Sequence, residues 1–119
     1  MKIFILILIL LLFQSCSDNT KKEEIPLKTT KEITLFKFDK TLNSLTNDIL
    51  CNINELNIEC LTKDDIDLTN LIATFETNGE KVFINDVEQT SALTPNNFTN
   101  AIQYKVVAQD DSEQIYNVI

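Results

Sequence analysis

The chain has 119 residues, with 10 basic and 18 acidic side chains, one glycine, and neither histidine nor tryptophan. Its net charge of −8 excludes a nucleic-acid binder, because such proteins present basic surfaces to the phosphates. Without histidine there is no His-based triad and no HExxH zinc site, and one glycine cannot form a glycine-rich phosphate loop. We therefore expect no cofactor and no nucleic-acid partner.

The N-terminus has the features of an export signal. Residues 3–13 form an unbroken apolar run after Lys2, and a helix of that length spans only about 16 Å of a bilayer core of about 30 Å. Ser15-Cys16 follows and resembles a bacterial lipobox. We predict a lipoprotein signal peptide over residues 1–15 and lipidation of Cys16, which would attach the protein to the membrane. An ordinary secreted protein cut nearby, or a retained N-terminal anchor, is the alternative.

Residues 16–30 are polar, mixed in charge and interrupted by Pro26, so we expect a flexible tether. Asp18 and the Glu23-Glu24 pair lie near the cysteine and resemble the surface-export signals of Bacteroidota lipoproteins. We therefore predict an outer-membrane location, at the cell surface rather than on the periplasmic face. The acidic chain repels anionic headgroups, so the domain should stand off the membrane.

From Lys31 onward, short alternating apolar runs separated by polar turns predict an all-β domain over residues 31–119. About seven such runs favour an Ig-like antiparallel β-sandwich. The apolar positions are Ile33, Phe36 and Phe38; Ile49, Cys51 and Ile53; Ile58, Cys60 and Thr62; Leu71, Ala73 and Phe75; Val82 and Ile84; Ile102, Tyr104, Val106 and Ala108; Tyr116 and Val118.

Two segments depart from simple alternation. The missing step between Ile33 and Phe36 predicts a β-bulge. Residues 41–50 place Leu42, Leu45 and Ile49 at helical spacing, but we interpret this segment as a loop entering the second strand.

Cys51 and Cys60 remain after Cys16 is lipidated, an even number in an oxidising compartment. If the flanking strands pair as a hairpin with Ile53 opposite Ile58, the two cysteines also face each other within disulfide range. Two free buried thiols, or strands in different sheets whose thiols never meet, are the alternatives that the sequence leaves open.

The order of short motifs resembles a domain common in Bacteroidota lipoproteins. I-x-x-F-x-F begins at Ile33, D-I-x-x-x-I at Asp48, D-L-T-x-L-x-A-x-F at Asp67, and the sequence VFINDV over residues 82–87 leads to the closing motifs. Those motifs are QTS over residues 89–91, LTPNNF over 93–98, YKV over 104–106 and YNV over 116–118. The resemblance covers residues 31–119.

That family is a domain of unknown function with an immunoglobulin- or cadherin-like sandwich, often found at the N-terminal end of surface glycan-binding proteins. The resemblance implies this fold and carries over no catalytic or binding residue. Glycine is usual in the family where this chain has Asp65, Asp86 and Asp111, and aspartate is frequent in place of Asn97.

Three candidate sites deserve weighing against plainer interpretations. Asp65-x-Asp67-x-Thr69 with Glu76 mimics a calcium loop, but Asn70 replaces the required glycine and no helices flank it, which favours a solvated acidic loop. Asn97-Phe98-Thr99 fits a glycosylation sequon that we attribute to chance in a bacterial chain. Adjacent acids such as Asp110-Asp111 point to opposite faces of an extended chain, so we expect no catalytic residues and no enzyme activity.

Sugar binding usually requires exposed aromatic side chains. Tyr104 and Tyr116 fall on apolar strand faces and are expected in the core. Phe83 has the opposite parity to Val82 and Ile84, so it is either an exposed contact residue or packed against another element.

Two functions remain from the sequence. The first is a non-enzymatic, lipid-anchored envelope protein that serves as a spacer or protein-interaction module. The alternative is a surface glycan-binding or adhesive module. In either case the partner is a protein or a glycan that the sequence does not identify.

Overall fold

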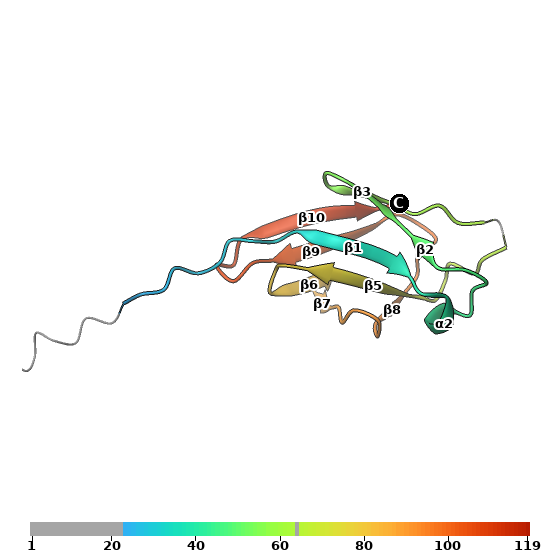
Figure 1. Cartoon of the computed structure of the whole chain (residues 1–119), viewed down its shortest axis with the longest axis horizontal. Helices are drawn as coiled ribbons and strands as arrows, with labels where there is room; N and C mark the ends of the chain where they lie inside the picture. The colour runs from blue at the N-terminus through green and yellow to red at the C-terminus, as the bar shows by residue number, and fades with distance from the viewer. Residues whose placement is uncertain (1–22, 64) are drawn as a thin grey trace, which may run out of the picture.

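The computed structural model describes residues 23–63 and 65–119, so the predicted signal peptide and Cys16 lie outside the described residues. Within this part the chain forms two packed β-sheets, and the all-β sandwich prediction is confirmed (Figure 1). No helix among the described residues is long and apolar enough to span a membrane.

The smaller sheet has the strand order β2-β1-β5-β8. Its strands are β1 (Ile33–Phe38), β2 (Ile49–Leu50), β5 (Leu71–Thr77) and β8 (Pro95–Asn96). The register between β1 and β5 shifts between Ile33 and Leu35, which confirms the predicted bulge.

The larger sheet has the order β3-β4-β10-β9-β6-β7. Its strands are β3 (Asn52–Asn54), β4 (Asn57–Glu59), β6 (Lys81–Ile84), β7 (Val87–Glu88), β9 (Ile102–Val107) and β10 (Glu113–Val118). Strands β4 and β10 run parallel, so the sheet is mixed where we predicted an antiparallel one.

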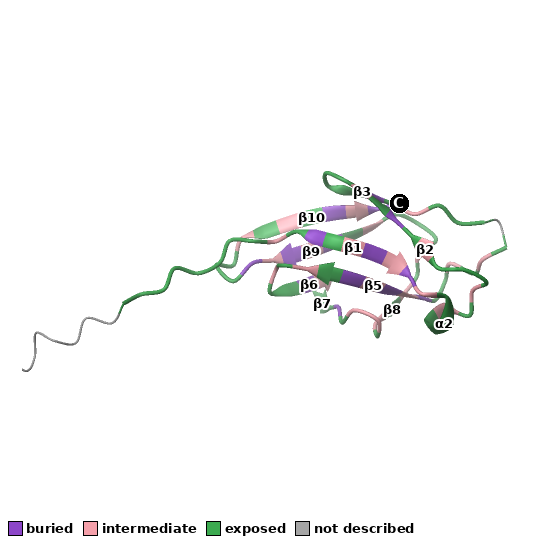
Figure 2. Cartoon of the chain, viewed as in Figure 1, coloured by how far each residue is buried: buried purple, intermediate pink, exposed green. Residues whose placement is uncertain are grey.

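The core lies between the sheets and takes one face of each long strand. Its fully buried side chains include Phe36, Ile58, Tyr104 and Val106, each 0% exposed. Buried positions alternate with half-buried or exposed ones along β1, β5, β9 and β10 (Figure 2). Within the part of the chain that the structure describes, the hydrophobic core extends from Ile33 to Val118.

Aromatic side chains occupy the centre of the core. The Phe36 ring meets Tyr104 edge-on with 5.1 Å between ring centroids, and Phe75 meets Tyr104 edge-on at 5.8 Å. Phe38 packs edge-on against Phe98 at 4.9 Å. The contacts of Tyr104 with Phe36 and Phe75 join the two sheets, because Tyr104 belongs to β9 and both phenylalanines belong to the smaller sheet.

The segment after β1 differs from the prediction in two ways. Residues 40–43 form a short helix, α2 (Lys40–Asn43), whose N-cap is Asp39, where we predicted only a loop. The run from Ile49 to Ile53, predicted as one strand, divides at Cys51 into β2 in one sheet and β3 in the other. Pairing on both sides explains the break, because Leu50 pairs with β1 and Asn52 with β4.

The last residues of the predicted tether contact the domain. The Lys28 amide donates to Gln109 Oε1 at 2.9 Å, and the Thr30 hydroxyl donates to the Asn78 carbonyl at 2.9 Å. Residues 23–30 extend from one end of the sandwich, whereas α2 lies at the opposite end (Figure 1). The domain therefore has an end at which the N-terminal segment enters and a far end.

Candidate functional site

A groove of about 810 Å³ lies at the far end of the sandwich. Two stretches of chain line it: residues 43–50, from the end of α2 through β2, and residues 61, 63, 65–67, 70 and 71, which lead into β5. Among the residues that the structure describes, no tyrosine and no phenylalanine lines the groove, so the groove lacks the ring surfaces on which sugars usually stack.

Several polar groups beside the groove are used to hold its walls. The Asn43 side chain donates to the Ile72 carbonyl at 2.9 Å and accepts from the Ile72 amide at 2.7 Å. Asp48 accepts from the Lys40 amide at 2.8 Å. These side chains tie the helical turn to β5 and to the loop before β2, so their first role is structural.

The calcium-like motif is arranged as a turn followed by a strand. Asp67 accepts hydrogen bonds from both the amide and the hydroxyl of Thr69, and these bonds lower the pKa of the Asp67 carboxyl. Glu76, the twelfth residue of the motif, lies on β5 opposite Leu35. Within residues 23–63 and 65–119, no group of three or more His, Cys, Asp or Glu side chains is placed to hold a metal ion.

Cys51 and Cys60 are joined by a disulfide, with their Cα atoms 4.4 Å apart. The predicted hairpin register, Ile53 opposite Ile58, is confirmed in the pairing of β3 with β4. The bond encloses that hairpin and lies next to the point where the chain passes from one sheet to the other. Whether the protein isolated from cells carries it stays a prediction.

Tyr104 and Tyr116 are buried, as predicted, with 0% and 4% exposure. The Tyr116 hydroxyl accepts from the Ile33 amide at 3.3 Å. Burial raises the pKa of the Tyr104 hydroxyl, and the Asn96 side chain beside it offsets this only in part. Neither tyrosine is available as a sugar-stacking surface.

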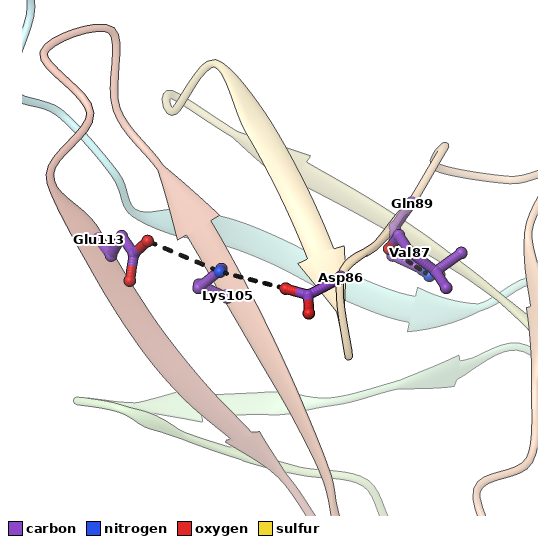
Figure 3. Close-up of polar contacts among 5 residues, drawn as sticks. All are labelled: Asp86, Val87, Gln89, Lys105 and Glu113. Atoms are coloured by element: carbon purple, nitrogen blue, oxygen red, sulfur yellow. Dashed lines mark hydrogen bonds and ion pairs between the residues drawn. The ribbon is translucent and has the colours of Figure 1, made fainter.

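Phe83 is half-buried on the outer face of the larger sheet, and Lys105 Nζ lies 5.6 Å from the centre of its ring. The same ammonium group approaches Glu113 at 3.6 Å and Asp86 at 3.9 Å (Figure 3). Figure 3 also shows a hydrogen bond within the chain that follows β6, in which the Gln89 side chain donates to the Val87 carbonyl at 3.1 Å. Phe83 therefore lies on the outer face of the sheet, and the Lys105 ammonium group lies over its ring.

The sequence did not indicate that Lys105 would lie beside Phe83, Asp86 and Glu113. Its members belong to different strands, and Lys105 lies opposite Phe83 only because β6 and β9 pair in a particular register. Alternation assigned Phe83 to the outer face, but it gives no information about which residue of another strand lies beside it.

A comparison with known protein families shows to which family the chain belongs. Residues 33–119 match the family described as SGBP, N-terminal, a domain of surface glycan-binding proteins. The chain belongs to this family. The match spans both sheets of the sandwich and is consistent with the resemblance found in the sequence motifs. No curated protein and no solved structure matches the chain.

Membership bears on the two functions left open by the sequence. The family is a glycan-binding, non-catalytic one, and its proteins are typically associated with the cell surface. It therefore supports the glycan-binding alternative more than the spacer that we placed first.

Proposed function

We propose that this chain is a surface glycan-binding or adhesive module, lipid-anchored at the outer membrane through Cys16. The family match over residues 33–119 is the observation that carries the proposal, since it covers the entire sandwich. The protein would recognise glycan without cleaving it.

Three carboxylates of the described part are poorly suited to act as a general acid. Hydrolysis of a glycosidic bond requires one carboxyl group that keeps its proton near neutral pH. Asp110 accepts hydrogen bonds from the Ser112 hydroxyl and amide, and these bonds lower the pKa of its carboxyl. Asp39 and Asp67 also have lowered pKa values, so all three are suited to remain ionised.

Binding is tested with the mature chain from residue 17 onward, produced without the signal segment and therefore without lipid. Its migration is compared in native gels with and without dissolved polysaccharide, alongside a glycan array. We expect retardation by at least one polysaccharide. Migration unchanged across the panel, together with an empty array, contradicts the glycan-binding function and returns the chain to the spacer role.

The anchor is tested separately in the full-length protein. Cys16→Ala removes the thiol to which lipid would be attached, so the variant should leave the membrane fraction for the soluble one. Ser17→Ala is the matched control and should remain with membranes. Metabolic labelling with a fatty acid gives a second measurement, and a Cys16→Ala protein that still sediments with membranes contradicts the anchor.

A further inference from the structure

Four amide side chains form a row across four adjacent strands of the larger sheet. Asn54 of β3 pairs with Asn57 of β4, Asn57 pairs with Asn117 of β10, and Asn117 pairs with Gln103 of β9. Residues that are directly opposite in neighbouring strands place their side chains on the same face of the sheet. We call these four residues the amide row.

The amide row lies on the outer face of the sandwich. The residues beside its members in the chain point into the core: Ile58, Val118 and Tyr104 are 0%, 3% and 0% exposed. Successive side chains of a strand alternate between faces, so the row points away from the core. Asn54, Asn57 and Gln103 are exposed, and Asn117 is half-buried.

Most of the hydrogen-bonding capacity of the row is free. Among residues 23–63 and 65–119, the one hydrogen bond made by these four side chains runs from Gln103 Nε2 to Asn117 Oδ1, at a long 3.4 Å. Each amide has two N–H donors and a carbonyl acceptor. A sugar hydroxyl likewise donates and accepts, so the row offers complementary groups to a polyhydroxylated chain.

The spacing of the row suits an extended glycan. Neighbouring strands are about 4.7–4.9 Å apart, so four strands place four amides over roughly 14 Å. The spacing between neighbouring strands is close to the length of one hexose along an extended polysaccharide, which allows successive sugars to meet successive strands.

Apolar groups lie beside the amides. In the next row across the sheet, Ile115 and Phe83 are the residues on either side of Lys105, and Ile115 is 43% exposed. The C–H faces of sugar rings pack against such surfaces while their hydroxyls reach polar groups.

The charges favour a neutral ligand. The row itself is uncharged, and Lys105 is shared between Asp86 and Glu113 rather than left for an anion. The net charge of −8 repels polyanions. Resting on the proposed function, we infer that the amide row is the contact surface for a neutral polysaccharide lying across the strands, with Phe83 and Ile115 beside it.

The test compares two pairs of substitutions in the chain from residue 17 onward. Asn57→Ala with Asn117→Ala removes the centre of the row. Asn47→Ala with Asn70→Ala is the matched control, because both residues are exposed and line the far-end groove. Thermal melting of each variant establishes that it is folded.

The probes are xyloglucan, mixed-linkage β-glucan, galactomannan and starch as neutral polysaccharides, with alginate and polygalacturonate as anionic ones. We expect the wild type to bind a neutral probe. The row variant should lose at least tenfold in affinity, and the groove variant should stay within twofold of the wild type.

The outcomes separate the two proposals. A wild type that binds no probe and no array glycan overturns the proposed function and this inference with it. A wild type that binds while the folded row variant binds equally well overturns only the inference. A larger loss in the groove variant, or a preference for the anionic probes, does the same. If the row serves a protein partner instead, glycan binding is unchanged by the row substitutions.

Discussion

The half of the domain from β5 to β10 and the segment from Asp39 to Asn70 are held in place by different means. Strands β5, β9 and β10 have six or seven residues each, and β9 and β10 pair over their whole length. Strands β2, β3 and β4 have only two or three residues. The long strands of the first region are fixed by continuous pairing over a buried core, although its strands β7 and β8 have only two residues each.

The second region depends on single local contacts. Asp39 caps α2, Asn43 joins it to β5, and a disulfide encloses the β3–β4 hairpin. Regions with few buried contacts open locally, whereas core strands open only with global unfolding. Damage to the first region should therefore unfold the whole domain, and damage to the second should be smaller and partly local.

The largest effect is expected from Val106→Asp. Val106 on β9 is 0% exposed, so an aspartate there would bury an unpaired carboxylate at a cost of several kcal/mol. A small domain has a stability of about 5–15 kcal/mol, so this change should leave little folded protein. Circular dichroism and gel filtration measure the loss.

Gln103→Asp is the control for that substitution, because Gln103 lies on the same strand with its side chain exposed. It should melt near the wild-type temperature. A Val106→Asp protein that is soluble and melts normally would mean that the core is not the main support of the first region.

The difference between the two regions also explains which parts of the fold could be predicted from the sequence. Hairpins of long strands alternate strictly, and the burial of Ile84, Tyr104, Val106 and Tyr116 was predicted and is confirmed. The turn after Ile84 is also consistent with the sequence, since Asn85 and Asp86 both have positive φ, as the glycine of the family at position 86 implies.

In the second region, the strand pairing depends on contacts between distant parts of the chain, which the pattern of one sequence does not reveal. The parallel pairing of β4 with β10 joins residues 57–58 to residues 117–118, and alternation gives no information on such distant partners. The change of sheet at Cys51 leaves the alternation of Ile49, Cys51 and Ile53 intact, so it has no local signal. The amide row was missed for the same reason, because it exists only in the register between strands.

The next largest effect is expected from the double change Cys51→Ala and Cys60→Ala. A closed loop of about ten residues stabilises by roughly 2–3 kcal/mol in the chain-entropy model. The melting temperature should fall clearly while the domain still folds. Hydrogen exchange should accelerate mainly in residues 49–60. Alkylation and mass spectrometry of protein from the envelope should find no free thiol at either position.

A matched control exists for the disulfide. The wild type measured with a reducing agent should melt like the double variant. Two alkylatable thiols in native protein would contradict the bond, and accelerated exchange spread evenly over β9 and β10 would contradict the local character of the second region.

A smaller loss is expected from Gly79→Ala, in the turn between β5 and β6. A Cβ atom at Gly79 would clash with Cγ1 of Val106, a side chain that is itself fully buried. Overpacking of this kind costs about 1–3 kcal/mol. The Gly79→Ala, Val106→Ala double variant removes the obstructing methyl groups, so the two changes should be non-additive in chemical denaturation. Strict additivity would show that the clash is relieved elsewhere.

The smallest effect is expected from Asp39→Ala, which removes the N-cap of α2. Asp39 Oδ1 accepts from the amides of Thr41 at 2.8 Å and Leu42 at 3.1 Å, and the bond from Leu42 is the main reason that the pKa of its carboxyl is lowered. A lowered pKa means that the ionised cap stabilises the folded state above the ordinary value of 3.8 and that this contribution is lost as the pH falls through the folded pKa. The difference in melting temperature between wild type and variant should therefore be constant near neutral pH and shrink below pH 3.8.

Asn also caps helices but does not titrate, so Asp39→Asn should melt near the wild type at pH 7 without this acid dependence. A difference between Asp39→Ala and the wild type that persists unchanged in acid would show that α2 is held by Asn43 and its bonds to β5 rather than by its cap.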